Sequence, residues 1–446
     1  MTQPDVLNLL QDLIAAAQQA GADSADAVAM DGASVSHAWR LGSTERLERS
    51  EDADIGLRVF VGRRQALVST TDRKPQALRD LAERAVAMAR VVPEDPHSGL
   101  ADAELIATAF PELSIEDPVE PAPEELIGRA RTAEEAALAV AGVTNSEGAE
   151  AAWSRSAIAL AASNGFAGHY ARSYHSISVS VLAGEGTGME REYDHSVAVY
   201  AEDLTDPAQL GRQAGEKAVR RLNPRKIKSC QVPVVYDPRV SGGLVGHLSG
   251  AISGAAIARG TSFLKDRLDA MVFADGVTIV EDPHRLRGQA SRPFDGEGLP
   301  TRRKAIIDKG RLTTWLLDLR SARQLGLKST GNAGRGVSSP PSPTATNLWM
   351  EPGRISRDAL IGGIARGLYV TELIGMGVNG ITGDYSRGAA GFWIEDGELT
   401  HPVSEITVAS NLKQMFANLT PADDLVFRYA TNAPTLSIDG MTIAGN

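Results

Sequence analysis

The first half of the chain alternates stretches of helical and strand periodicity. Apolar residues recur every three to four positions over residues 4–20, 75–91 and 123–140, which predicts three amphipathic helices. Between the first two helices, the segments ADAVAMD, ASVSHAWRL and DIGLRVFVGRRQALVST are typical of strands, and the last alternates around a Gly-Arg turn. Helices and strands therefore follow one another from the start of the chain.

Residues 143–202 have the two-residue period of consecutive strands. The run AAWSRSAIALAASNGFAGHYARSYHSISVSVLAGE alternates apolar and polar side chains around a turn at Asn164–Gly165. A helix over residues 207–222 follows, and the basic run Arg220–Lys228 is typical of a solvated helix end and linker. We therefore expect residues 1–225 to form an N-terminal two-layer α/β domain.

The second half has a different pattern. A strand, QVPVVYD, precedes a glycine-rich helix over residues 240–258, and irregular stretches such as EDPH, DGEG and SSPPSP follow. Near the end, GFWIEDGELTHPV and PTLSIDGMTIAG are hairpin patterns that turn on Asp396–Gly397 and Asp439–Gly440. We expect an α+β protein in which residues 226–446 form a mostly antiparallel, barrel-like β domain around this central helix.

The central helix carries a glycine at every fourth position, and these residues are Gly242, Gly246, Gly250 and Gly254. This spacing places them along one face, where a partner or peptide backbone can approach closely. Four interior glycines cost about 1 kcal/mol each in helix propensity, so the face needs a compensating role. Tight packing within the chain and a peptide or partner interface are the two interpretations.

Charge and hydropathy limit the partners. The net charge of -11 and the lack of a basic tract argue against nucleic-acid binding, which requires Lys and Arg to neutralise phosphates. Residues 240–258 carry no charge and are long enough to cross a bilayer, but five glycines and no aromatic anchors favour a buried soluble helix. We therefore expect neither a nucleic-acid nor a membrane partner.

The single cysteine and the first residues predict a cytoplasmic protein. Cys230 has no partner for a disulfide within the chain, which suits a reducing compartment. The first helix contains Asp5 and Asp12 and lacks a basic start, unlike a signal peptide. Cys230 precedes an apolar strand, so we expect it to be structural.

A search for catalytic motifs finds no local site. None of the eight histidines precedes a glutamate, so the zinc-binding H-E-x-x-H helix is missing. The chain also lacks a Walker A loop and a G-x-S-x-G nucleophile elbow. His169 and His175 can share a strand face, but no third ligand accompanies them. We therefore assign no catalytic and no metal-binding residue.

From residue 234 onward the sequence resembles the TldD/PmbA family. The resemblance rests on VVYDPRVSGGLVGHLSGAISGAAIARGTSFLKDRL, VEDPHRLRGQASRPFDGEGLPTRR, LLDLRSARQLGLKSTGNAGR, GDYSRGAAGFWIEDGELTHPVSEITVASNL and PTLSIDGMTIAG. These segments occur in order over about half the chain. The family has two branches, and its TldD branch binds zinc through an H-E-x-x-x-H helix and a later cysteine.

Alignment on Gly260, Thr261 and Ser262 implies that this chain has lost the zinc ligands. Val245 and Gly246 stand where the His-Glu pair would stand, and Gly250 replaces the second histidine. Residues 412–433 contain no cysteine. Neither valine nor glycine can bind zinc or act as a base. The chain therefore resembles the PmbA branch, also called TldE.

The resemblance implies a non-catalytic subunit of a heterodimeric metalloprotease that cleaves unfolded or extended peptides. A TldD-type partner would supply the zinc, this chain would need no cofactor, and self-pairing as a homodimer is open when the partner is absent. Two alternatives stay open. One is a self-sufficient hydrolase that uses His169, His175 or His195 with Asp194, and the other is a regulatory binding protein of the gyrase-modulator kind.

Overall fold

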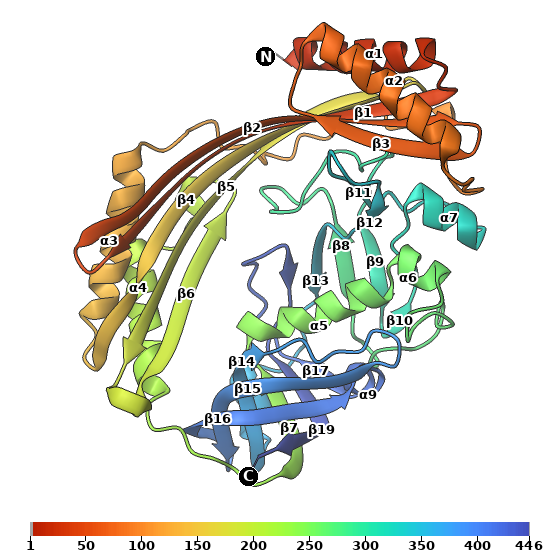
Figure 1. Cartoon of the computed structure of the whole chain (residues 1–446). Helices are drawn as coiled ribbons and strands as arrows, with labels where there is room; N and C mark the ends of the chain where they lie inside the picture. The colour runs from red at the N-terminus through yellow and green to blue at the C-terminus, as the bar shows by residue number, and fades with distance from the viewer. Residues whose placement is uncertain (1–2, 446) are drawn as a thin grey trace.

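The computed structural model describes residues 3–445. A long, curved antiparallel sheet forms the first half of the molecule (Figure 1). Its strands lie in the order β3-β2-β1-β4-β5-β6. They are β1 (Ser24–Arg40), β2 (Ser43–Val61), β3 (Arg64–Thr70), β4 (Val143–Ala162), β5 (Ala167–Ala183) and β6 (Glu190–Ala198).

Four helices cover the convex face of this sheet, namely α1 (Gln3–Gln19), α2 (Pro75–Val91), α3 (Pro123–Leu138) and α4 (Pro207–Arg220) (Figure 1). In β1, β2, β4 and β5 the odd-numbered residues face them, and in β3 and β6 the even-numbered residues do, because alternate residues of a strand point to the same side. Ala27 and Leu57 belong to the core under α1 and α2, and Trp153 and Val179 to the core under α3 and α4. The alternation in the sequence thus predicted the buried face correctly.

The strands are longer than the sequence predicted. The segments expected as two strands form the single strand β1, which pairs with β2 and β4 along its length. The polar residues 43–53 also belong to β2, although their side chains are exposed. Hydrogen bonding to β1 holds this polar stretch extended, so its strand state depends on a partner and not on its own periodicity.

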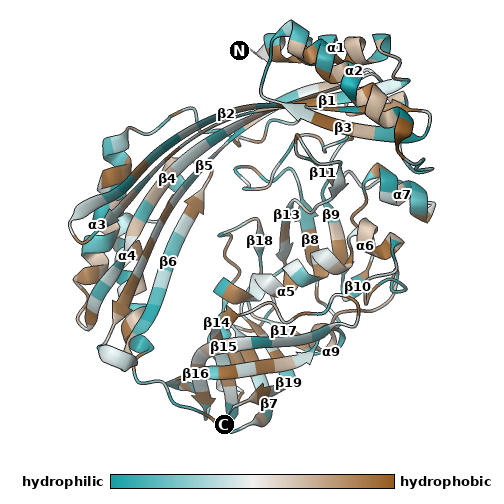
Figure 2. Cartoon of the chain, viewed as in Figure 1, coloured by the Kyte–Doolittle hydropathy of each residue, from teal (hydrophilic) through white to brown (hydrophobic). Residues whose placement is uncertain are grey.

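A closed β-barrel lies in the second half. Its ring runs β16-β15-β14-β7-β19 and closes through pairing of β16 with β19. These strands are β7 (Cys230–Tyr236), β14 (Arg366–Ile374), β15 (Asp384–Glu395), β16 (Glu398–Asn411) and β19 (Leu436–Ala444), and β17 (Leu419–Pro421) pairs with β19. Hydrophobic and hydrophilic residues alternate along β15 and β16 (Figure 2). The α+β architecture with a barrel-like second half is therefore confirmed.

One predicted hairpin is a single strand. Asp396–Gly397 forms the expected turn between β15 and β16, with positive φ at both residues. Asp439–Gly440 instead lies within β19, where the register with β7 shifts between Ile438 and Met441. Gly440, with φ of 73°, supplies a bulge that lets one strand continue around the barrel.

A second sheet stacks beside the barrel in the order β10-β9-β8-β13-β18. Its strands are β8 (Ile279–Asp282), β9 (Lys304–Asp308), β10 (Arg311–Leu312), β13 (Asn347–Met350) and β18 (Thr431–Asn432), and β11 (Ala333–Gly334) pairs with β12 (Ser342–Pro343). The helices of this half are α5 (Pro238–Ala251), α6 (Gly254–Ala258), α7 (Leu319–Leu325), α8 (Arg357–Gly362) and α9 (Leu412–Ala417). Single 3₁₀ turns are η1 (Ala103–Leu105), η2 (Gly186–Gly188) and η3 (Ala201–Asp203). Helix α5 lies between the barrel and this sheet (Figure 1), and one core joins all three.

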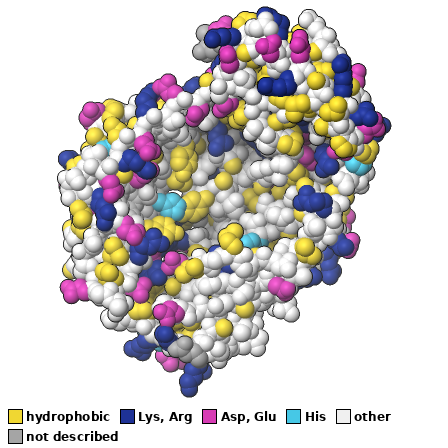
Figure 3. Space-filling model, in the orientation of Figure 1, with side chains coloured by type: hydrophobic (Ala, Val, Ile, Leu, Met, Phe, Trp, Pro, Cys, Tyr) yellow, Lys and Arg dark blue, Asp and Glu magenta, His cyan; other side chains and the backbone are white. Residues whose placement is uncertain are grey.

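The two halves enclose a hollow. The concave face of the long sheet looks across it toward the second half, and hydrophobic side chains are visible on its walls (Figure 3). Residues 93–122 contribute to the junction, since Arg323 donates hydrogen bonds to the backbone oxygens of His97, Gly99 and Leu100. In the described part of the chain, no helix is both long and apolar enough to cross a membrane.

Candidate functional site

Helix α5 is held rigidly at its start. Asp237 caps the helix by accepting a hydrogen bond from the Arg239 N–H at 2.9 Å, and Pro238 occupies the first turn. The other carboxylate oxygen of Asp237 accepts a 2.6 Å hydrogen bond from the Tyr369 hydroxyl of β14. The apolar face of α5, with Leu244, Val245 and Leu248, is buried in the common core. The helix therefore presents a fixed outer face.

The glycines of the central helix have two different environments. A Cβ at Gly242 would lie 3.1 Å from the Thr431 carbonyl oxygen, and one at Gly254 would lie 2.9 Å from the Leu316 carbonyl oxygen. Both positions are therefore packed tightly within the chain. A Cβ at Gly246 or Gly250 would meet no atom within 4 Å. Those two glycines leave the helix surface open.

Gly243 belongs to the open face, although the spacing of one glycine every fourth residue does not include it. It is exposed, and a Cβ there would also meet no atom within 4 Å. Steps of four residues drift by about 40° around a helix, whereas the seven residues from Gly243 to Gly250 return to within about 20°. The chain also leaves α5 at Ala251, so Gly254 starts a separate helix, α6. The adjacent pair Gly242–Gly243 was the feature of the sequence that could have shown a second row of glycines on the helix.

A cavity of about 340 Å³ lies beside the open glycine face. Its lining combines α5, the segment after α6, the β14–β15 loop, β15 and the start of α9. The lining residues are Gly246, His247, Gly250, Ala251, Thr261, Phe263, Met376, Val378, Gly380, Arg387 and Leu412. Ile374 at the end of β14 and Met376 and Ile381 of the following loop are exposed, and Met376 is 92% accessible. An apolar loop thus borders a helix face that has no side chains.

Helix α5 carries two titratable side chains, Arg239 at its start and His247, and His247 lines this cavity. Its ring lies edge-on to Tyr385 at 6.0 Å. Burial lowers the pKa of His247, and the nearby positive charge of Arg387 lowers it further. His247 is therefore a neutral side chain that packs against Tyr385 and lines the cavity. One histidine does not make a zinc site, which needs three or four ligands.

The residues at the ligand-equivalent positions do not fit zinc. The side chain of Val245 is fully buried in the core, and Gly246 and Gly250 have no side chain. Zinc requires thiolate, imidazole or carboxylate donors, which none of these residues provides. Over residues 3–445, no group of three or more His, Cys, Asp and Glu side chains is placed to hold a metal ion.

The histidines of the hydrolase alternative are kept apart. His169 and His175 do share one face of β5, but six strand residues separate them by roughly 20 Å. His175 is buried, with its Nε2 3.2 Å from an Asp117 carboxylate oxygen. His195 pairs with Ser178 and so points to the opposite face of the sheet, where it stacks on Tyr429 at 5.2 Å.

The proposed acid partner of these histidines is also engaged elsewhere. Asp194 is buried and its carboxylate lies 2.6 Å from the Lys217 Nζ of α4. Lys217 holds this carboxylate on the helix-covered side of the sheet. Cys230, at the start of β7, is half-buried and pairs with Ile443 of β19 in the barrel. The structure brings none of these groups together into a nucleophile–base arrangement.

Comparison with known proteins gives consistent matches along the chain. Family models for the PmbA/TldA metallopeptidase match residues 25–89 as domain 1, 116–222 as the central domain and 229–445 as the C-terminal domain. The metalloprotease PmbA of Escherichia coli O157:H7 is 40% identical over 426 residues, which is 95% of this chain and 92% of that protein.

Two crystal structures have the same fold. A proposed modulator of DNA gyrase from Bacteroides thetaiotaomicron superposes with a TM-score of 0.91 at 27% identity, covering 98% of each chain. TldE from Thermococcus kodakarensis superposes with a TM-score of 0.85 at 20% identity, covering 98% of this chain and all of the other. The latter similarity is evidence of fold alone.

Proposed function

This chain belongs to the PmbA/TldD metalloprotease family, and we propose that it is the zinc-less subunit of a two-subunit peptide-processing protease. A TldD-type partner would hold the zinc ion and hydrolyse the peptide bond. This chain would complete the chamber in which an unfolded or extended peptide lies. It would also stabilise the active assembly.

The side-chain chemistry of α5 carries the proposal. Metal-assisted hydrolysis requires a bound Lewis acid or an activated water, together with a general base. The positions that supply these groups in the TldD branch hold Val245, Gly246 and Gly250 here. The Val245 side chain is fully buried in the core and carries no atom that could bind zinc. Catalysis would therefore depend on a second chain.

The open face of α5 supports a role in assembly. Gly243, Gly246 and Gly250 leave room for another backbone to approach the helix at van der Waals distance. The exposed apolar side chains of Ile374, Met376 and Ile381 lie at the end of β14 and on the loop that follows it. Exposed apolar surface beside a rigid helix is typical of protein-binding sites. The partner or the substrate peptide would occupy this face.

Co-purification with a TldD-type partner tests the proposal. The experiment measures zinc content and cleavage of an unstructured peptide for the lone chain, the lone partner and the pair. We expect zinc and cleavage in the pair, and neither in this chain alone. Stoichiometric zinc with cleavage by the lone chain would refute the proposal. A pull-down that recovers a different class of partner would favour a regulatory binding role.

A pair of matched variants sharpens the test. Gly246→Leu and Gly250→Leu add side chains into open space, so the lone chain should fold normally but assemble at least tenfold more weakly. Gly128→Leu on α3 is the control, because a Cβ there also meets no atom within 4 Å. Unchanged assembly by the α5 variants would exclude the open glycine face as the contact surface.

A further inference from the structure

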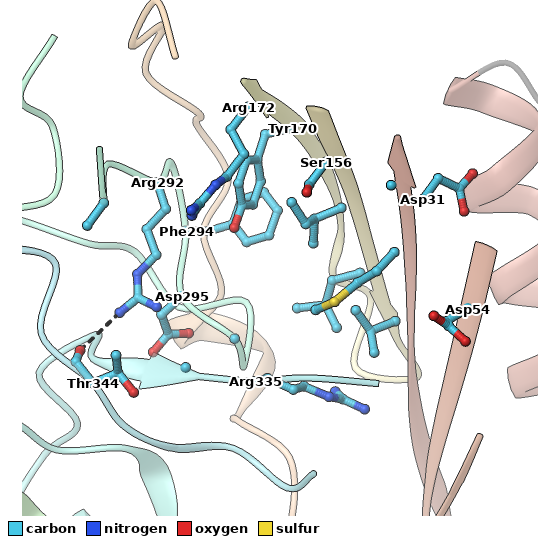
Figure 4. Close-up of a pocket in the computed structure, with 18 of the residues that line it drawn as sticks. Asp31, Asp54, Ser156, Tyr170, Arg172, Arg292, Phe294, Asp295, Arg335 and Thr344 are labelled. Carbon is cyan, nitrogen blue, oxygen red and sulfur yellow. Dashed lines mark hydrogen bonds between the residues drawn. The ribbon is translucent and has the colours of Figure 1, made fainter. Parts of the chain in front are cut away.

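A second cavity lies between the two halves, away from α5. Its volume is about 470 Å³, within the range of small-ligand sites. One wall is the concave face of β1, β2, β4 and β5, and the other is formed by residues 290–296 and 334–345 of the second half (Figure 4). The proposed protease role does not use this cavity.

Strand register organises the sheet wall into transverse rows. Asp52 pairs with Gly32, Gly32 with Ser156, and Ser156 with Arg172, so one row crosses β2, β1, β4 and β5. Paired residues in neighbouring antiparallel strands point to the same face. The row therefore has a carboxylate at one end, a guanidinium at the other, and two small residues between them.

The next row, Asp54–Met30–Ile158–Tyr170, has a carboxylate at one end, a neutral phenol at the other and two apolar residues between them. Val28 and Leu160 extend the apolar floor, and Phe294 packs edge-on to Tyr170 at 5.3 Å. Tyr170 and Arg172 lie together at one side of the cavity, with Asp54 on β2 at the other (Figure 4). The cavity is thus apolar in its centre and oppositely charged at its two ends.

The charged groups at the two ends are free to bind a ligand. Within residues 3–445, the side chains of Arg172 and Asp54 make no hydrogen bond or ion pair, and the only hydrogen bond to the Asp52 side chain is a long one of 3.4 Å from the Ser50 hydroxyl. Two other charged side chains of the cavity, Arg292 and Asp295, already make hydrogen bonds within the chain. Arg292 donates to the carbonyl oxygens of Ala333 and Thr344, and Asp295 accepts from the backbone N–H groups of Glu297, Leu299 and Ala333.

Two further charged residues line the cavity without defining its polarity. Asp31 points to the opposite face of the sheet and pairs with Arg73. Arg335 forms an ion pair with Asp26 at 2.7 Å, and its Nε and Nη2 atoms are buried without a hydrogen-bond partner in the described chain. Arg335 therefore adds donors without hydrogen-bond partners to the wall. Its side chain is buried, whereas that of Arg172 is exposed.

The spacing of the charged ends selects the ligand length. Three strand steps of about 4.8 Å separate β2 from β5 by about 14 Å. The Asp and Arg side chains at the two ends line the cavity, and a charge-assisted hydrogen bond to the ligand at each end takes up about 3 Å of this span. An extended peptide advances about 3.4 Å per residue, so a tripeptide with its two charged termini fits the remaining distance. Gly32 adds no side chain between the two ends, which leaves a trough for the peptide backbone.

We infer that this cavity binds a short peptide with free termini and an apolar side chain. The ammonium group lies against Asp52 and Asp54, the carboxylate accepts hydrogen bonds from Arg172, and the apolar side chain rests on Met30 and Ile158. This inference goes beyond the proposed protease role, because it assigns a ligand to this chain alone. Short peptides of this kind are what a protease releases.

Isothermal titration calorimetry on the lone full-length chain with Ala-Leu-Ala tests the inference. We expect saturable binding with one site. N-acetylated and C-amidated forms of the same peptide should each bind at least tenfold more weakly, because each loses one charge-assisted contact. Equal binding of either blocked peptide, or no binding of the free peptide at millimolar concentration, would overturn the inference.

Charge-neutral variants locate the site. Arg172→Gln should weaken Ala-Leu-Ala at least tenfold but leave the affinity for the amidated peptide nearly unchanged. The double variant Asp52→Asn with Asp54→Asn should show the converse selectivity for the acetylated peptide. Arg84→Gln is the control that matches the charge change of Arg172→Gln, and the double variant Asp80→Asn with Glu83→Gln matches that of the cavity double variant; all three residues are exposed on α2. Wild-type affinities in the cavity variants would place the peptide elsewhere. The outcome is independent of zinc or partner binding.

Discussion

At the scale of single residues, buried charges join the two halves. Asp26 of β1 accepts hydrogen bonds from Arg58 of β2 through both carboxylate oxygens and also lies 2.7 Å from Arg335 of the second half. All three side chains are almost fully buried. A buried carboxylate shared by two guanidinium groups is retained because separation would leave an unpaired buried charge.

Glu297, in the same region, has an unusual protonation equilibrium. Burial, and next the negative charge of Asp295, raise the pKa of its carboxyl group to about 8. One oxygen of Glu297 accepts a 2.8 Å hydrogen bond from the Leu319 N–H. Because the folded pKa exceeds the unfolded value of 4.5, the native state holds this proton more tightly than the unfolded chain.

This difference predicts that stability falls as pH rises. The contribution of Glu297 is fully present below about pH 4.5 and is lost as the pH rises toward about 8. The limit is about 1.4 kcal/mol per pH unit, so roughly 2 kcal/mol is lost between about pH 6 and pH 8. Glu297→Gln keeps the hydrogen-bond acceptor and should flatten this dependence in urea unfolding. Glu83→Gln is the exposed control, and a wild-type slope for Glu297→Gln would contradict the prediction.

At the scale of elements, α5 combines a tightly packed start with an open middle. Its glycine content lowers helix propensity throughout, but only Gly242 is needed for close approach of another part of the chain. Gly246 and Gly250 could accept a methyl group without contact. Their presence is therefore not explained by packing within this chain, and the proposed binding of another chain at this face would account for it.

Alanine scanning of these glycines should separate the two environments. Gly246→Ala and Gly250→Ala should each raise the free energy of unfolding by about 0.5–1 kcal/mol, because alanine favours the helix and meets no neighbour. Gly242→Ala and Gly254→Ala should lower it, since the new methyl group presses on a carbonyl oxygen. Chemical denaturation of the lone chain measures all four. Destabilisation by all four variants would show that the open face is packed.

At the scale of the whole molecule, an ion-pair network ties the end of the long sheet to the second half. Glu192 of β6 lies 2.8 Å from Arg239 of α5 and 3.3 Å from Arg221 in the linker. Arg221 also reaches Glu372 of β14 at 2.6 Å. Glu192 is almost completely buried, so this network is shielded from screening by salt. It fixes how the sheet and the barrel enclose the hollow.

Loss of the central carboxylate should loosen this junction. Glu192→Gln leaves the buried guanidinium of Arg239 without its ion-pair partner, whereas Arg221 keeps Glu372, and we expect a loss of about 3–5 kcal/mol in stability. The linker over residues 221–229 should become more sensitive to limited proteolysis. Glu147→Gln is the control, because its pair with Arg191 is exposed and should contribute less than about 1 kcal/mol. If the linker resists proteolysis equally in both variants, other contacts hold the junction together.

The sequence by itself determined the elements that depend on local pattern. Helix α2 spans Pro75–Val91 as predicted, and the turns at Asn164–Gly165 and Asp396–Gly397 follow from turn chemistry. The alternation along β4 and β5 identified the buried face before any partner was known. The sequence also showed that Val245, Gly246 and Gly250 cannot supply zinc ligands. These features follow from backbone periodicity and residue type.

Only the tertiary structure decided which distant residues meet. The register that aligns Asp52 with Arg172 depends on three strand pairings that involve segments from opposite ends of the first half. Gly242 is tightly packed and Gly243 is open because only Gly242 lies against the Thr431 carbonyl oxygen. The high pKa of Glu297 depends on its complete burial. Contacts between distant segments are set by the packing of the whole chain and have no local period, so the sequence pattern could not predict them.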